Sequence, residues 1–159
     1  LGVDQDRILV KEIARRTGCP AVTSTLSIIE ALNALRIKKI GLVTPYVTSI
    51  QERIVNNFSL EKFECISERH FNLTDNFSFG EVSEDRIASA AEEVVADGAE
   101  AVIILCTNLA GAGVAARVER ETGIPVLDSV VLTVWGALKS VGKNTSSLEK
   151  WAPAVSKIL

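Results

Sequence analysis

Methionine is absent from this sequence of 159 residues, and tyrosine and histidine each occur once. The three cysteines are an odd number, and neither they nor the one histidine, His70, have the spacing of zinc ligands. These absences argue against a disulfide framework and against a metal site. We therefore expect Cys19, Cys65 and Cys106 to be reduced thiols.

Long hydrophobic runs and runs of positive charge are also missing. The most apolar stretches, 101–105 and 130–135, are far shorter than the roughly 20 residues that cross a bilayer. No run of Lys or Arg exceeds two residues, and the formal net charge is −3, which argues against a nucleic-acid surface. The start of the chain has no signal-peptide pattern. We expect a cytoplasmic protein with neither a nucleic-acid nor a membrane partner.

What the chain does have is a regular alternation of helical and strand patterns. Helices are predicted at 4–16, 25–35, 48–58, 83–97, 110–121 and 130–141. Strands are predicted at 20–24, 38–44, 62–67, 99–105 and 124–129, and a polar loop at 68–82. Several strands are apolar on both faces, which predicts an α/β fold with a parallel sheet covered by helices.

One internal similarity suggests duplication. RTGCPAVTS (16–24) and ETGIPVLDS (121–129) share Thr, Gly, Pro and Ser at matched positions, and each lies between two helical patterns. On this alignment, a first copy of the segment around Cys106 would fall at or before Leu1, so we expect the chain to be a fragment. The alternative is that Thr-Gly-x-Pro is only a common connection from a helix to a strand.

The stretch VIILCTNLAG (102–111) places Cys106 at the end of an apolar strand and just before a helix predicted to begin near Ala110. Unpaired amides at a helix start favour a thiolate over a thiol, and the amides of Thr107 and Asn108 could hold a carboxylate. A cysteine at the end of a buried strand is also a common core residue. The pattern alone leaves both interpretations open.

The segments LCTNL, VERETGIPVLDSVVLTVWGALKSVG and RTGCPAVTSTLSIIEALNALRIKKIGLVTPYVTSIQER resemble the aspartate/glutamate racemase superfamily, in its maleate cis-trans isomerase and arylmalonate decarboxylase branch. The resemblance implies two similar Rossmann-like or flavodoxin-like lobes, related by a pseudo-two-fold duplication, with the first lobe incomplete here. It also implies an active site between the lobes, one cysteine from each lobe and no cofactor.

The resemblance also implies site residues. Cys106 matches the catalytic cysteine of the second lobe, and the matched substrate-binding positions are Tyr46, Asn76, Thr107 and Asn108. Thr44 ends a predicted strand, where it either adds a further hydroxyl to the site or is simply the last strand residue. Cys19 and Cys65 do not replace the first cysteine, and His70 is expected to be a surface loop residue. Relatives often have Asn where this chain has Gln51.

The function implied is isomerisation of a small dicarboxylate, as in the conversion of maleate to fumarate. Alternatives are an amino-acid or hydantoin racemase, an arylmalonate-type decarboxylase and, from another class, a non-catalytic ligand-binding domain. We expect 25–128 to form the complete second lobe, and 1–24 with 129–159 to be the remainder of the first. Taken alone the 159 residues would lack one thiol and are expected to be inactive and to self-associate, whereas family members are commonly homo-oligomers.

Overall fold

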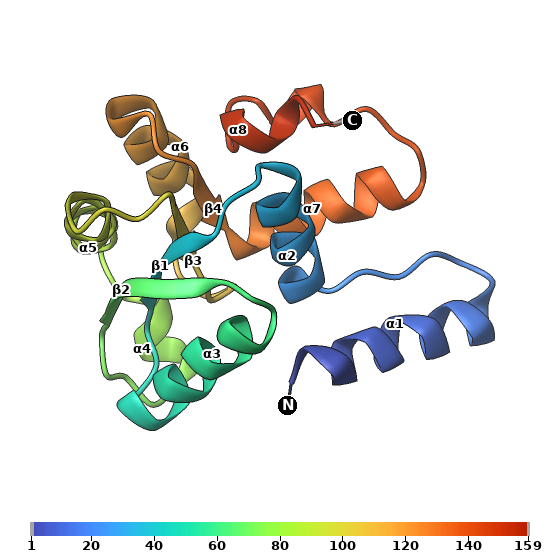
Figure 1. The fold of residues 1–159 in the computed structure, drawn as a ribbon, viewed down its shortest axis with the longest axis horizontal. Coiled ribbons are helices and arrows are strands. Elements are labelled where there is room, and N and C mark those ends of the chain that lie inside the picture. The colour runs from blue at the N-terminus through green and yellow to red at the C-terminus, as the bar shows by residue number, and fades with distance from the viewer. Residues whose placement is uncertain (1, 159) are drawn as a thin grey trace.

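The computed structural model describes residues 2–158, which form a four-stranded sheet in the order β2-β1-β3-β4 with helices on both faces (Figure 1). All neighbouring strands are parallel: β1 (Lys39–Thr44), β2 (Glu64–His70), β3 (Ala101–Ile104) and β4 (Val126–Asp128). The predicted α/β fold with a parallel sheet is confirmed. The helices are α1 (Val3–Thr17), α2 (Ser24–Ala34), α3 (Thr48–Leu60), α4 (Asn76–Gly80), α5 (Glu84–Ala96), α6 (Gly111–Thr122), α7 (Ser129–Ser140), the 3-10 turn η1 (Ser146–Leu148) and α8 (Pro153–Ser156).

Successive residues of the strands point to opposite faces of the sheet and feed two separate cores. On one face, strand residues such as Leu42 and Ile103 pack with α2, α3 and α7. On the other, residues such as Val43 and Ile104 pack with α5 and α6. Burial on both faces explains why these strands read as continuous apolar runs in the sequence.

Helices α2 and α7 pack against each other as well as against the sheet. The contact is close at Gly136, where an added Cβ would lie 2.0 Å from the Oγ of Ser27. Any larger residue at position 136 would push the two helices apart. This contact lets the middle of α7 lie close to the first turn of α2.

The repeated sequence corresponds to repeated local structure. Helices α1 and α6 both end at a left-handed glycine, Gly18 with φ 71° and Gly123 with φ 73°. In both, the preceding threonine hydroxyl donates back to a helix carbonyl, from Thr17 at 2.8 Å and from Thr122 at 2.7 Å. Each turn leads to a helix that starts at the matched serine. Duplication of whole lobes stays a prediction.

Two expectations about local structure were wrong. Residues 20–23 do not form a strand, because no neighbouring strand among residues 2–158 pairs with them, whereas the matched segment β4 pairs with β3. The loop predicted at 68–82 is shortened, because β2 continues to His70 and α4 forms at Asn76–Gly80. The polar end of β2 is stabilised by ion pairs from Arg69 to Glu93 and Asp97.

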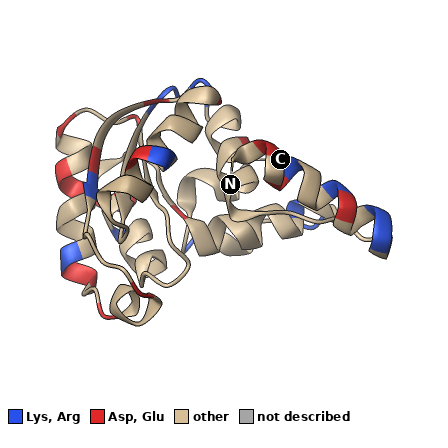
Figure 2. Ribbon diagram, turned by 90° about the horizontal axis from the view of Figure 1, so that it is seen from below, with Lys and Arg blue, Asp and Glu red and all other residues tan. Residues whose placement is uncertain are grey.

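Charged residues of both signs are spread over the molecule, including α1, which projects away from the sheet (Figure 2). Within residues 2–158, no helix combines the length and the apolar character needed to cross a bilayer.

Candidate active site

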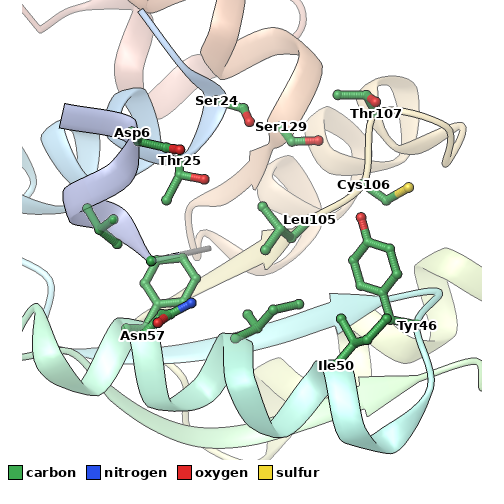
Figure 3. Close-up of a pocket in the computed structure, with 14 residues that line it drawn as sticks. Asp6, Ser24, Thr25, Tyr46, Ile50, Asn57, Leu105, Cys106, Thr107 and Ser129 are labelled. Carbon is green, nitrogen blue, oxygen red and sulfur yellow. The ribbon is translucent and has the colours of Figure 1, made fainter. Parts of the chain in front are cut away.

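A cavity of about 400 Å³ opens at the carboxyl ends of β1 and β3 (Figure 3). In parallel sheets this edge is where ligands usually bind. Side chains from the turn after β1, the turn after β3, α3, and the first turns of α1, α2 and α7 line it: Val3, Asp6, Ser24, Thr25, Tyr46, Ile50, Ile54, Asn57, Phe58, Leu105, Cys106, Thr107 and Ser129, together with Gly2.

Cys106 follows β3 directly and is 6% exposed. Its Sγ accepts a hydrogen bond from the backbone amide of Asn108 at 3.4 Å. Helix α6 begins only at Gly111, so the thiol receives its donor from the tight turn at 107–109 rather than from the first turn of the helix. A backbone donor aimed at sulfur stabilises a developing thiolate.

Tyr46 lies in the turn after β1, and its hydroxyl contacts the thiol of Cys106. Burial, followed by the hydrogen bond and charge interaction with Cys106, raises the pKa of Tyr46. Its ring packs edge-on against Phe79 with a centroid separation of 5.5 Å. Tyr46 is therefore a fixed phenol that stays protonated and can donate a hydrogen bond to the sulfur or to a ligand.

Thr44, the last residue of β1, does not line the cavity. It is fully buried, and its hydroxyl donates to the side-chain carbonyl of Gln51 at 2.7 Å. The amide nitrogen of Gln51 has no hydrogen-bond partner among the described residues. The pair therefore ties α3 to the end of β1 and supports the wall that carries Ile50 and Ile54.

The remaining expected site residues fall into two groups. Thr107 is exposed and lines the cavity. Asn76 and Asn108 are exposed and lie beside each other outside the cavity wall, where the Asn108 side-chain amide donates to the backbone oxygen of Asn76 at 3.3 Å. The structure thus brings Cys106, Tyr46 and Thr107 together and places the two asparagines next to them.

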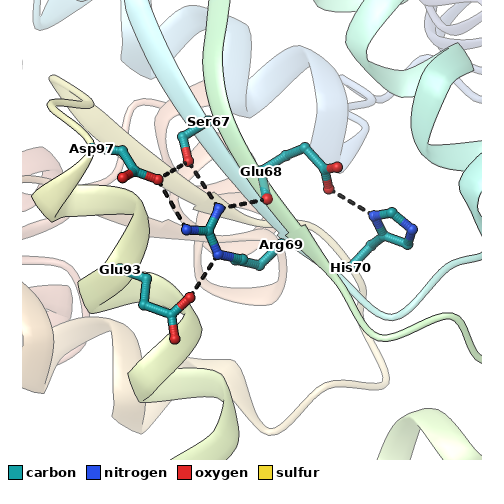
Figure 4. Close-up of polar contacts among 6 residues, drawn as sticks. All are labelled: Ser67, Glu68, Arg69, His70, Glu93 and Asp97. Carbon is teal, nitrogen blue, oxygen red and sulfur yellow. Dashed lines mark hydrogen bonds and ion pairs between the residues drawn. The ribbon is translucent and has the colours of Figure 1, made fainter.

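The other two cysteines and the histidine lie elsewhere. Cys19 is exposed, and Cys65 is half-buried in β2, where burial and the charge of Glu68 raise its pKa to about 11. His70 ends β2 rather than lying in a loop, and its ring contacts Glu68 at 2.8 Å (Figure 4). The other ring nitrogen lies 3.2 Å from the hydroxyl of Thr48.

Sequence reasoning missed several polar residues of the cavity, chiefly Asp6, Ser24, Thr25 and Ser129. Asp6 accepts a hydrogen bond from Thr23 at 2.9 Å. Ser24 and Ser129 are the matched serines of the internal repeat, which was a signal that could have found them. Among the described residues that line the cavity, none is Lys, Arg or His, so an anionic ligand would be held by neutral donors.

A thiol and a phenol facing one cavity at the carboxyl edge of a parallel sheet define an α/β protein suited to cysteine-based covalent or acid–base chemistry. Residues 1–151 match the family model described as arylmalonate decarboxylase. The chain belongs to this arylmalonate decarboxylase family, which confirms the resemblance found in the sequence.

Known relatives fall on both sides of the predicted branch. The chain is 26% identical to maleate isomerase of Pseudomonas putida, covering 88% of this chain and 54% of that protein. It is 23% identical to arylmalonate decarboxylase of Bordetella bronchiseptica, covering 79% and 53%. A structure of Nocardia farcinica maleate cis-trans isomerase, a cysteine-to-serine mutant with a covalently bound succinylcysteine intermediate, superposes with a TM-score of 0.86 at 22% identity over 96% of this chain and 64% of that one. The chain spans about half the length of the curated relatives it matches.

Proposed function

We propose that this chain carries the Cys106 half of a cofactor-independent isomerase that converts maleate to fumarate. The observation that carries the proposal is the position of Cys106, which lines the cavity beside Tyr46 and whose Sγ accepts a hydrogen bond from the Asn108 amide. Similarity to several maleate isomerases supports the substrate class.

In the proposed reaction, the Cys106 thiolate adds to one carbon of the double bond and forms an S–C bond. The π electrons move to the neighbouring carbon, next to its carboxylate, where the second cysteine of the complete enzyme donates a proton and takes one back when the Cys106 thiolate leaves. Rotation about the resulting single bond and elimination of the thiolate then give fumarate. The Nocardia mutant carries its succinylcysteine on a cysteine other than the one replaced by serine, so it supports a covalent cysteine step in general and leaves the choice of Cys106 to the test below.

The proposed roles of the neighbouring residues follow from their positions. Tyr46 donates a hydrogen bond to substrate, and Thr107 and Asn108 hold the carboxylate nearest the reacting carbon. Asn76 binds substrate from its place beside Asn108. Thr44 acts only indirectly, because its hydroxyl is engaged by Gln51.

We also propose that 25–128 is one lobe and that 1–24 with 129–159 belongs to a second lobe. Support comes from the sheet, whose strands all lie within residues 39–128, and from α2 and α7, which pack together at the two boundaries. A cytoplasmic homo-oligomer is part of the proposal, supported by three free cysteines and by the exposed apolar face of α1.

The test uses two measurements. Mass spectrometry after incubation with maleate is expected to find the adduct on Cys106, and this readout needs only one thiol. Proton NMR of the complete enzyme, which supplies the second thiol, measures turnover to fumarate. Cys106→Ala should abolish both signals, and Cys19→Ala should leave both unchanged. Adduct formation or turnover that survives Cys106→Ala would overturn the mechanism.

A second candidate function is decarboxylation of a substituted malonate. The apolar wall formed by Ile50, Ile54, Phe58 and Leu105 favours a substrate with an apolar group. Similarity to the Bordetella decarboxylase supports it. Proton NMR with maleate, aspartate and a phenyl-substituted malonate in parallel separates isomerisation, racemisation and decarboxylation.

A further inference from the structure

The cavity contains a polar feature that the chemistry at Cys106 does not use. Ser129 lines the cavity but is only 1% exposed, and its buried Oγ has no hydrogen-bond partner among the described residues. A buried hydroxyl without a partner is costly unless a ligand or water completes it.

Ser129 is also the first residue of α7, a helix of 12 residues. The side chain of Asp128 caps this helix by accepting the amides of Val130 and Val131 at 2.9 and 3.0 Å through one oxygen. These two amides are therefore already taken by an acidic side chain, and the donor that this end of α7 leaves for a ligand is the Ser129 hydroxyl.

A second helix starts on the same cavity. Ser24 and Thr25 are the first two residues of α2 and both line it, and Ser24 is the position matched to Ser129 by the repeat. In the view of Figure 3, Ser129 lies between Ser24 and Thr107.

We infer that Ser129 and the first turns of α7 and α2 form a subsite for a carboxylate, distinct from the Thr107–Asn108 turn. On the proposed function, on which this inference rests, the turn holds one carboxylate of the dicarboxylate and the Ser129 subsite holds the other. Asp6, the one acidic side chain among the described residues lining the cavity, opposes an anion at the α1 side and directs the second carboxylate towards Ser129.

The experiment compares two ligands of equal length, succinate with two carboxylates and butyrate with one. Each is titrated against the rate at which iodoacetamide alkylates Cys106, followed by mass spectrometry. The protein is expected to be protected more strongly by succinate. Ser129→Ala should weaken protection by succinate about 10-fold, which is the usual effect of losing one hydrogen bond to a charged group. Protection by butyrate should stay the same.

The matched control is Ser27→Ala. Ser27 is also a buried serine whose Oγ has no partner among the described residues, but it lies on α2 outside the cavity lining. This substitution should leave the protection of Cys106 by succinate and by butyrate unchanged. Ser129→Thr and Ser129→Val form a second pair of nearly equal shape, and only the variant with a hydroxyl should keep the preference for succinate.

Equal protection by succinate in Ser129→Ala and in the unchanged protein would overturn the subsite, as would equal behaviour of the Thr and Val variants. Failure of the proposed function looks different: maleate forms no adduct and no fumarate while Ser129 still governs the preference for succinate. Loss of that preference on Ser27→Ala would assign the effect to helix packing and would also overturn the subsite.

Discussion

The backbone amide of Asn108 donates a hydrogen bond to the Sγ of Cys106 across 3.4 Å, while the side chain of the same residue points to Asn76. One residue therefore serves the thiol through its main chain and the neighbouring loop through its side chain. The two roles can be separated by mutation, because a side-chain substitution keeps the amide.

Asn108→Ala should leave the rate of Cys106 alkylation by iodoacetamide within about 2-fold, since the N–H donor stays in place. Conversion of maleate by the complete enzyme should fall by about 10-fold, because the side chain contributes one charge-assisted hydrogen bond to the substrate carboxylate. Alkylation is followed by mass spectrometry and turnover by NMR. A large loss of alkylation would show that the side chain, rather than the amide, supports the thiol.

Tyr46→Phe should slow both alkylation of Cys106 at neutral pH and turnover by about 10-fold or more, because the thiolate loses a hydrogen-bond donor. The phenyl ring keeps the edge-on contact with Phe79, so the melting temperature should change little. Thermal unfolding checks the second point. An unchanged alkylation rate would mean that Tyr46 does not act on the sulfur.

The architecture and the central part of the site could be predicted from the sequence. Alternating apolar runs predicted the parallel sheet, and Cys106, Tyr46 and Thr107 follow strands, so the topology alone brings them to one edge. The strand expected at 20–24 failed because strand formation needs a neighbour, which a local pattern does not report.

The missed residues show what local reasoning omits. Asp6, Ser24 and Ser129 come from three helix starts that are distant in sequence and meet only through packing of α1, α2 and α7. Thr44 was expected at the site because it ends a strand, but its hydroxyl bonds to Gln51, one turn into α3. Which polar group finds a partner inside the protein depends on tertiary contacts.

Cys65 should react slowly with iodoacetamide at pH 8, because burial and the charge of Glu68 raise its pKa to about 11 and keep the thiol protonated. Its rate should rise about 10-fold per pH unit until the pH approaches that value. Exposed Cys19 is the internal comparison. Glu68→Gln should increase the Cys65 rate at pH 8, and a decrease would contradict the assigned cause.

The exposed apolar face of α1 should promote self-association. Leu9 and Ile13 are 50% and 39% exposed, whereas Val114 and Val118, their matched residues on α6, are fully packed in the core. Replacing Leu9 and Ile13 together by Glu should shift the protein towards monomer in size-exclusion chromatography with light scattering. The control is Leu60→Glu on α3, another exposed apolar position. If the unchanged protein, the double variant and Leu60→Glu have the same molar mass in solution, the apolar face of α1 does not drive self-association.

Asp128 should make stability depend on pH in a direction opposite to that of most carboxylates. Burial raises its pKa above the ordinary value of 3.8, although the amides of Val131 and Val130 oppose this effect. The folded protein therefore holds this proton more tightly than the unfolded chain. Its contribution to stability is greatest at low pH and is lost as the pH rises through the raised pKa.

Asp128→Asn keeps an oxygen that can cap α7, but its side chain cannot ionise. The unfolding free energy of this variant relative to the unchanged protein should therefore increase as the pH rises through the raised pKa of Asp128, and then level off. Asp128→Ala removes the cap and should destabilise the protein by about 1 kcal/mol or more at every pH. Urea unfolding at a series of pH values from about 3 upwards measures both differences. Because the comparison is between variants, the opposite contributions of Asp75, Asp97 and Glu100, whose pKa values are lowered, cancel. A difference between the Asn variant and the unchanged protein that shrinks with rising pH would show that the helix start stabilises the Asp128 charge more than burial penalises it.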